Sequence, residues 1–185
     1  MGTSVPQPDS GTCHVPDIHT NNIFNGGVFT LFSEMRRKEK LMSPEDTIKV
    51  LKEAEFGSLA CIGENGYPYS VPLNYAYENN AIYFHSAHAG NKIENIKRYN
   101  KVSFSVVNYQ KLLPEKFDTE YDSAIVYGNA FEVTDEQEKR DALMFLIEKY
   151  SGNYRDQGIA YIDRAIKAVS VYKIQIIHMT GKLGR

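Results

Sequence analysis

The chain has 185 residues, of which 42% are hydrophobic, which is enough for one domain with a buried core but not for two domains of ordinary size. Its 21 basic and 23 acidic residues give a formal net charge of -2 and a pI near 6.2, which argues against an electrostatic nucleic-acid binder. No apolar run approaches the roughly 18 residues of a membrane-spanning helix, and two cysteines, Cys13 and Cys61, favour a cytoplasmic compartment over a disulfide-linked secreted fold.

The first 34 residues differ from the rest of the chain. They contain no Lys or Arg, and Asp9, Asp17 and Glu34 give them a charge of -3, which leaves +1 for the remainder. Pro, Gly, Asn, Ser and Thr dominate their first part without periodicity. We therefore predict that residues 1–34 are a flexible N-terminal extension or an added leader, and that residues 35–185 form a single domain.

The clearest local signals follow this leader. Ser43 can cap a helix, Pro44 suits the first helical position, and the acidic residues after it suit the first turn. Further along, Asn65-Gly66 is typical of a two-residue hairpin turn. This part of the chain is predicted to form a helix over 44–55 and a three-strand antiparallel meander over 57–63, 67–77 and 81–86.

The second half of the chain mixes strands with helices. Thr134 and Gln137 are spaced as a capping box at the start of a helix. One long polar segment carries an aromatic rim of Tyr109, Phe117 and Tyr121, and long loops inside compact domains are usually functional or mobile. The predicted elements are helices over 91–99, 134–150 and 158–168, strands over 102–107, 123–133 and 170–179, and a loop over 108–122.

Six strands, mostly linked as hairpins, predict a mainly β fold with inserted helices. A closed or split β-barrel suits this order better than a parallel sheet. A dinucleotide-binding parallel sheet would need regular strand–helix alternation and a Gly-rich turn after the first strand, and the sequence has neither. The two Cys and five His residues are scattered without the spacing of metal ligands, so we expect no metal site.

The segment from His85 to Lys92 is the most informative for chemistry. A strand ends in polar residues, Gly90 permits an unusual turn, and a helix begins at once. The first N–H groups of a helix attract anions, Ser86 adds a hydroxyl donor, and Lys92 adds a full charge one turn later. These residues suit a phosphate site, and an ordinary strand-to-helix corner with a solvated lysine is the alternative.

The second informative segment is the strand Tyr69–Asn74. Pro72 cannot donate a hydrogen bond to a neighbouring strand, so it marks a sheet edge or a break in pairing. Backbone groups freed there could bond a flat heteroaromatic ligand. An ordinary edge strand is the alternative interpretation.

Together these segments resemble the pyridoxamine 5'-phosphate oxidase-like flavoproteins, and within them the 5-nitroimidazole-resistance (Nim) group. The resemblance covers about residues 35–182. The motifs that carry it are Gly66-Tyr67-Pro68-Tyr69-Ser70-Val71-Pro72-Leu73, Ile82-Tyr83-Phe84-His85-Ser86-Ala87 with Gly90 and Lys92, Ile96-Lys97-Arg98, Ser123-Ala124-Ile125-Val126-Tyr127-Gly128, Glu138-Lys139-Arg140 and Thr180-Gly181-Lys182.

The resemblance implies an FMN-binding split β-barrel that forms a homodimer with the flavins at the subunit interface; FAD is possible in place of FMN. Backbone groups of Val71 and Leu73 would lie near the polar edge of the flavin ring, and Lys92 would pair with the phosphate. The related oxidases often carry Arg at the position of Asn91, so the phosphate would be held with one charge fewer. The implied cofactor-binding residues are Tyr69, Ser70, Val71, Pro72, Leu73, Asn74, His85, Ser86, Ala87, Asn91 and Lys92.

The resemblance further implies an FMN-dependent oxidoreductase that reduces nitroaromatics, such as 5-nitroimidazoles, or other small electron-poor compounds. His85 matches the proposed active-site histidine of the Nim group, although a lone histidine at a strand end is more often structural. The carboxy-terminal Arg- and His-bearing segment of true pyridoxamine-phosphate oxidases has no counterpart here, so we do not expect vitamin B6 synthesis. The alternative is a haem- or flavin-binding protein without turnover, with His85, His14 or His19 as a haem ligand.

Overall fold

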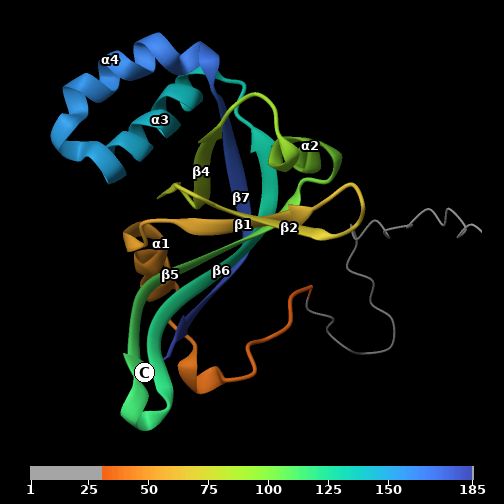
Figure 1. Cartoon of the computed structure of the whole chain (residues 1–185), viewed down its shortest axis with the longest axis vertical. Coiled ribbons are helices and arrows are strands. Elements are labelled where there is room, and N and C mark those ends of the chain that lie inside the picture. The colour runs from red at the N-terminus through yellow and green to blue at the C-terminus, as the bar shows by residue number, and fades with distance from the viewer. Residues whose placement is uncertain (1–30, 185) are drawn as a thin grey trace, which may run out of the picture. The chain divides into compact units, whose positions relative to one another are not determined.

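The computed structural model describes residues 31–184, and this part of the chain contains seven β-strands and four α-helices (Figure 1). The strands are β1 (Gly57–Ile62), β2 (Pro68–Leu73), β3 (Ala76–Glu78), β4 (Ala81–Ser86), β5 (Lys101–Leu113), β6 (Asp118–Glu132) and β7 (Ser170–Leu183). The helices are α1 (Pro44–Glu53), α2 (Asn91–Arg98), α3 (Glu136–Ser151) and α4 (Arg155–Ala165), with short 3-10 helices η1 (Lys38–Lys40), η2 (Pro114–Lys116), η3 (Gly152–Tyr154) and η4 (Ile166–Ala168).

All seven strands belong to one antiparallel sheet with the order β2-β1-β5-β6-β7-β4-β3. The two ends of this sheet, β2 and β3, follow each other in the sequence and are joined only by Asn74 and Tyr75. So short a connection requires the sheet to curl until its ends meet, which produces a barrel with a split. The predicted mainly β, split-barrel fold is therefore confirmed.

The predicted three-strand meander is wrong. The segment expected as one strand over 67–77 breaks into β2, which pairs with β1, and β3, which pairs with β4. The turn between β1 and β2 also differs from the expected two-residue turn. Gly63 and Tyr67 close it, so three residues form the loop, and Gly66 takes the left-handed conformation at φ 78°.

The predicted loop over 108–122 is also wrong. In its place β5 and β6 continue as a two-stranded ribbon, paired as far as Leu113 and Asp118, that extends beyond the rest of the sheet (Figure 1). A bulge between Val107 and Tyr109 marks where the ribbon begins. At its tip Phe117 has a positive φ of 50° and a side chain that is 99% exposed.

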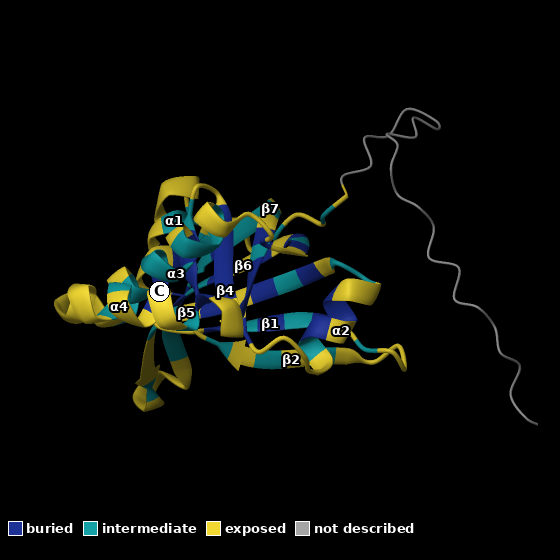
Figure 2. Ribbon diagram, turned by 90° about the horizontal axis from the view of Figure 1, so that it is seen from above, coloured by how far each residue is buried: buried dark blue, intermediate teal, exposed yellow. Residues whose placement is uncertain are grey.

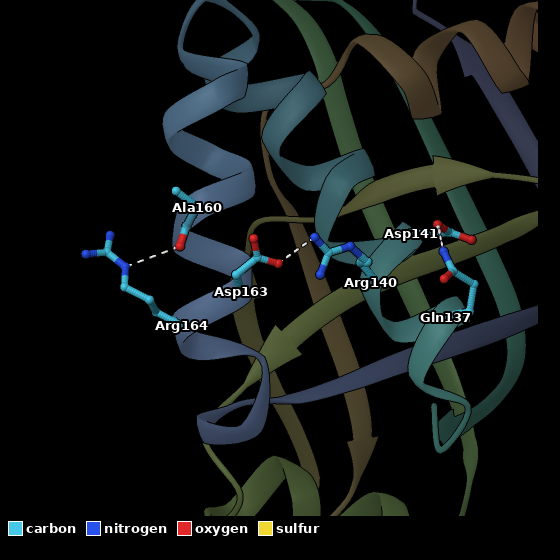
Figure 3. A network of polar contacts seen from close by, with 6 residues as sticks. All are labelled: Gln137, Arg140, Asp141, Ala160, Asp163 and Arg164. Atoms are coloured by element: carbon cyan, nitrogen blue, oxygen red, sulfur yellow. Dashed lines mark hydrogen bonds and ion pairs between the residues drawn. The ribbon is translucent and has the colours of Figure 1, made fainter.

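The helices begin where short polar side chains can cap them. Ser43 accepts a hydrogen bond from the Asp46 N–H at the start of α1, as predicted. The cap of α3 is Asp135, which accepts from the Glu138 N–H, and not the predicted Thr134. Helices α3 and α4 pack side by side and are linked by an ion pair between Arg140 and Asp163 (Figure 3).

The main core cluster joins buried residues of the strands to residues of α1 and α2. Buried stretches of β1, β4 and α2 are dark blue in Figure 2. Its largest fully buried side chains are Tyr75, Tyr172, Phe84, Phe104, Leu51, Leu59, Ile82, Ile93 and Ile174. Residues 34–185 cluster as one compact unit. The prediction for residues 1–34 falls almost entirely outside the described residues and stays a prediction. No helix between residues 31 and 184 is long and apolar enough to cross a membrane.

Candidate functional site

The split in the barrel lies between the end of β2 and the end of β4. The β3–β4 ladder pairs Ala76 with Tyr83, and continuing this register would set Asn74 opposite His85. The ladder stops instead, because Asn74 and Tyr75 connect β3 to β2, and β2 pairs with β1 at the other end of the sheet. The end of β2 at Asn74 and the end of β4 at His85 and Ser86 are therefore not paired with each other, and this interruption of the ladder is the split.

A sharp corner connects the end of β4 to α2. Gly90 has a φ of 134°, which side chains rarely permit, and a Cβ added to it would meet no atom within 4 Å. The Gly90 carbonyl accepts hydrogen bonds from the N–H groups of Ile93 and Glu94. No side chain of the described chain caps α2. The N–H groups of Asn91 and Lys92 therefore lie at an open helix N-terminus.

Two basic side chains come together at this corner. The pKa of His85 is lowered, first by partial burial of the ring and then by the positive charge of Lys92, so the two groups are electrostatic neighbours. Within residues 31–184, Lys92 forms no ion pair with an acidic side chain. Ser86, which is 6% exposed, ends β4 beside them. The corner thus holds positive charge and unpaired donors.

Strand β2 presents alternate side chains to the core and to the outside. Tyr69, Val71 and Leu73 pack against the buried core, whereas Ser70 and Pro72 are exposed. Ser70 and Pro72 are therefore the β2 side chains that are free to face a ligand. As the outer strand of the sheet, β2 has a second edge that pairs with no strand, so its backbone groups can meet a ligand. The roles expected for the backbone groups of Val71 and Leu73 stay predictions.

The predicted site residues fall into two groups. The β4–α2 corner holds His85, Ser86, Ala87, Asn91 and Lys92, and β2 with the residue after it holds Tyr69 to Asn74. His88 connects the corner loop to Ser170 and Lys167 through hydrogen bonds. Cys61 is buried, and burial raises the pKa of its thiol, as suits an unreactive core cysteine.

Sequence reasoning missed the residues that contact Tyr75, where the chain passes from β2 to β3. Tyr150 on α3 accepts a hydrogen bond from the Tyr75 N–H at 3.0 Å and lies within hydrogen-bonding reach of the Glu55 and Tyr75 carbonyls. The Tyr75 hydroxyl donates to the Leu51 carbonyl at 2.6 Å. The Lys149 ammonium lies 3.8 Å from the centre of the Tyr75 ring. No motif in the sequence signals these contacts, because they join segments far apart in the chain.

Two cavities of the described chain lie away from the split. One of about 350 Å³ lies at the carboxyl end of α2, where Tyr99, Phe131 and Tyr172 line it. The other, of about 510 Å³, lies between α1 and the base of the β5–β6 ribbon. Neither contains a predicted site residue. Among residues 31–184 no group of His, Cys, Asp and Glu side chains is arranged to hold a metal ion.

The β4–α2 corner fits the phosphate end of a flavin nucleotide. Gly90 leaves open space beside the loop, the first turn of α2 offers N–H donors, and Lys92 supplies charge. Asn91, in place of a second basic residue, can donate through its amide. The residues present are therefore compatible with a phosphate held mainly by one lysine and backbone donors.

Comparison with known proteins shows which family the chain resembles. The family model for pyridoxamine 5'-phosphate oxidase matches residues 43–183. A candidate 5-nitroimidazole antibiotic resistance protein from Bacteroides thetaiotaomicron shares 30% sequence identity, with a TM-score of 0.67, over 77% of this chain and 86% of its own. An FAD-binding protein from Mesorhizobium loti shares 25% identity, with a TM-score of 0.59, over 79% of this chain and 98% of its own.

A conserved hypothetical protein from Mycobacterium tuberculosis has a TM-score of 0.72 at 20% identity, over 82% of this chain and 91% of its own, which shows a shared fold alone. No curated protein matches the chain.

Proposed function

Since the chain belongs to the pyridoxamine 5'-phosphate oxidase-like split-barrel family, we propose that it binds FMN and acts as a flavin-dependent oxidoreductase. Its substrates would be small electron-poor aromatics such as 5-nitroimidazoles. The 30% identity to a candidate 5-nitroimidazole resistance protein supports this substrate class. The observation that carries the proposal is the corner of Ser86, Gly90 and Lys92 at the mouth of the split, beside His85.

Each part of the site has a separate task in this proposal. Lys92 and the first N–H groups of α2 hold the phosphate, with the Asn91 amide as a further donor. The outer edge of β2 from Ser70 to Asn74 offers backbone groups to the polar edge of the flavin ring. FMN carries one phosphate, and FAD carries two. The corner supplies one lysine charge, which suits the single phosphate of FMN.

His85 is the proposed proton donor to the substrate. A bound flavin supplies the electron-transfer chemistry, with NAD(P)H as a suitable donor. Reducing a nitro group to a nitroso group consumes two electrons and two protons and releases water, so protons must also reach the substrate. The pKa of His85 is lowered, so its ring is mainly neutral near pH 7. Since only the protonated ring donates, the reduction rate should increase as the pH falls toward that pKa.

We propose that the protein works as a homodimer. The outward face of the β5–β6–β7 sheet exposes Val107, Ile125, Tyr127 and Ile177, with 57%, 43%, 39% and 52% of each side chain accessible. The ladders set Ser105 beside Ile125, and Ile125 beside Thr180, so this face is continuous across three strands. An apolar face of this kind is typical of an interface between subunits. A second copy of the chain would cover it.

Identifying the chromophore tests the cofactor. The purified protein is denatured, and the released compound is separated and compared with FMN, FAD and riboflavin. We expect FMN. Release of FAD would leave the proposed flavin-dependent function in place but replace FMN by FAD as the cofactor. A Soret band without released flavin would support the haem-binding alternative.

Turnover then tests the reaction. NAD(P)H-dependent loss of the nitro absorbance of a 5-nitroimidazole is followed for the wild type and for His85→Ala. Removing a positioned proton donor typically costs about 10²–10⁴ in rate, and flavin occupancy should stay unchanged. Lys97→Ala, on the far end of α2, is the control. Absence of nitro reduction in flavin-loaded wild type would overturn the proposed substrate class.

A further inference from the structure

The loop between β4 and α2 is fastened by one side chain. His88 Nδ1 lies 2.9 Å from the Ser170 hydroxyl at the start of β7, and its Nε2 lies 3.2 Å from the Lys167 carbonyl in η4. Ser170 is 3% exposed, whereas the loop residues from Ala87 to Gly90 are all exposed. The histidine therefore connects a solvent-exposed loop to a buried anchor.

The proton positions in this arrangement follow from the acceptors around the ring. The Ser170 hydroxyl donates its single proton to Glu132 Oε1 at 2.6 Å, so it can only accept from His88 Nδ1. The Nε2 atom of the same ring lies 3.2 Å from the Lys167 carbonyl. The Ser170 hydroxyl thus joins His88 to the Glu132 carboxylate.

This relay borders the proposed phosphate corner. His88 lies two residues after Ser86 and two before Gly90, and Ser86 is the direct β4–β7 ladder partner of Ser170. Holding His88 against Ser170 and η4 therefore fixes the path from the end of β4 to Gly90. That path sets where the first N–H groups of α2 and the Lys92 side chain lie.

We propose that the relay His88–Ser170–Glu132 positions the phosphate-binding corner, with His88 as the positioning residue; this inference rests on the proposed flavin site. From β6 the ring faces the Glu132 carboxylate through Ser170, from β7 it meets the Ser170 hydroxyl, and from η4 it meets a backbone carbonyl. The basic groups of its own segment are His85 and Lys92.

Binding of two flavins separates this role from general destabilisation. FMN and riboflavin are titrated into apo-protein for the wild type, His88→Ala, His88→Asn, Ser170→Ala and Lys167→Ala. We expect His88→Ala and Ser170→Ala to weaken FMN roughly five- to twentyfold and riboflavin less than twofold, because only FMN carries the phosphate. Lys167→Ala is the matched control, because His88 contacts its backbone carbonyl alone, and it should bind both flavins as the wild type does.

The variant His88→Asn tests the hydrogen bond to Ser170 itself. An Asn side chain can donate to the Ser170 hydroxyl, so it should restore part of the FMN affinity that His88→Ala loses. His88→Asn also serves if His88→Ala fails to fold.

The possible failures are distinguishable. A wild-type protein that binds FMN and riboflavin equally would overturn the phosphate corner itself, and this inference with it. A preference for FMN that persists unchanged in His88→Ala and Ser170→Ala would overturn only the positioning role. An FMN affinity of His88→Asn no better than that of His88→Ala would overturn the hydrogen bond to Ser170 as the positioning contact.

Discussion

The hydroxyl of Tyr150 accepts a hydrogen bond from the backbone N–H of Tyr75, across 75 residues of sequence. This bond lies where the chain passes from β2, at one end of the sheet order, to β3, at the other end. Without it, the Tyr75 N–H would be a buried donor with no strand partner, because the β3–β4 ladder begins one residue later. Helix α3 therefore stabilises the break that opens the barrel.

Tyr150→Phe tests this contact. The variant removes the hydroxyl that serves the Tyr75 N–H and the Glu55 carbonyl, so we expect a loss of about 1–2 kcal/mol in the free energy of unfolding. Urea unfolding at pH 7 measures it. Tyr154→Phe is the matched control, since Tyr154 is 64% exposed and makes no hydrogen bond within the described chain. Equal stabilities for the two variants would show that the contact contributes nothing.

Lys92→Ala should weaken FMN about tenfold to a hundredfold, because a charge-assisted bond is worth roughly 1.5–3 kcal/mol. Riboflavin should bind the variant and the wild type almost equally. Fluorescence titration of apo-protein with each flavin measures both affinities. Lys97→Ala, on the same helix but paired with Glu94, serves as the control. An unchanged FMN affinity in Lys92→Ala would move the phosphate to another part of the chain.

The titration of His85 reports the same corner independently of activity. Partial burial and the charge of Lys92 hold the pKa of His85 below 6.5 in the flavin-free protein. Lys92→Ala removes one of these two causes and should raise that pKa, whereas Lys97→Ala should leave it unchanged. The imidazole resonances of His85, followed by NMR between about pH 4 and 8, give the values. A pKa above 6.5 in the flavin-free wild type would contradict the predicted direction.

Lys149→Met should stabilise the protein at pH 7 and lose this effect at high pH. The Lys149 ammonium is buried without a hydrogen-bond partner among the described residues, and burial lowers its pKa to about 8. Between this value and 10.5, its ordinary pKa, the unfolded chain binds more protons than the native one, so wild-type stability rises with pH. We expect Tm to be higher by roughly 2–4 °C in the variant at pH 7 and about equal near pH 10.

Thermal unfolding of both proteins at several pH values measures the difference. Lys52→Met, on the exposed side of α1, controls for the loss of one lysine. A lower Tm for Lys149→Met at pH 7 would show that the contact of the ammonium with the Tyr75 ring outweighs its burial.

Ile177→Asp should convert the proposed dimer into a monomer and release the flavin. The substitution places a carboxylate in the exposed apolar face of the β5–β6–β7 sheet, where a partner would bury it without compensation. Sedimentation velocity gives the mass, and absorbance gives flavin content. Phe117→Asp is the control, because Phe117 lies at the ribbon tip, away from this face. A wild-type protein that sediments as a monomer with bound flavin would contradict the dimer.

The sequence predicted elements well where the signals are local. Helix α2 was placed to within one residue, because Gly90 and the polar residues around it act on their own neighbours in the chain. The ribbon from Asn108 to Asp122 was missed because both its faces meet solvent, so its residues show no apolar alternation. The break at Tyr75 was missed because its partner, Tyr150, comes from a distant helix.

For the candidate site too, the residues that could be predicted are those that lie close together in the sequence. The corner from His85 to Lys92 was visible because its residues are consecutive, whereas the break between β2 and β3 depends on strand pairing that the sequence does not signal. The relay through Ser170 and Glu132 was not visible, since strand pairing and not sequence spacing brings these side chains to His88.

The two end strands of the sheet also decide how copies of the chain can associate. β2 carries Pro68 and Pro72, which cannot donate hydrogen bonds, and β3 is only three residues long. An additional strand would meet prolines on one edge and a very short strand on the other. Both features disfavour growth of the sheet into fibrous aggregates through its edges.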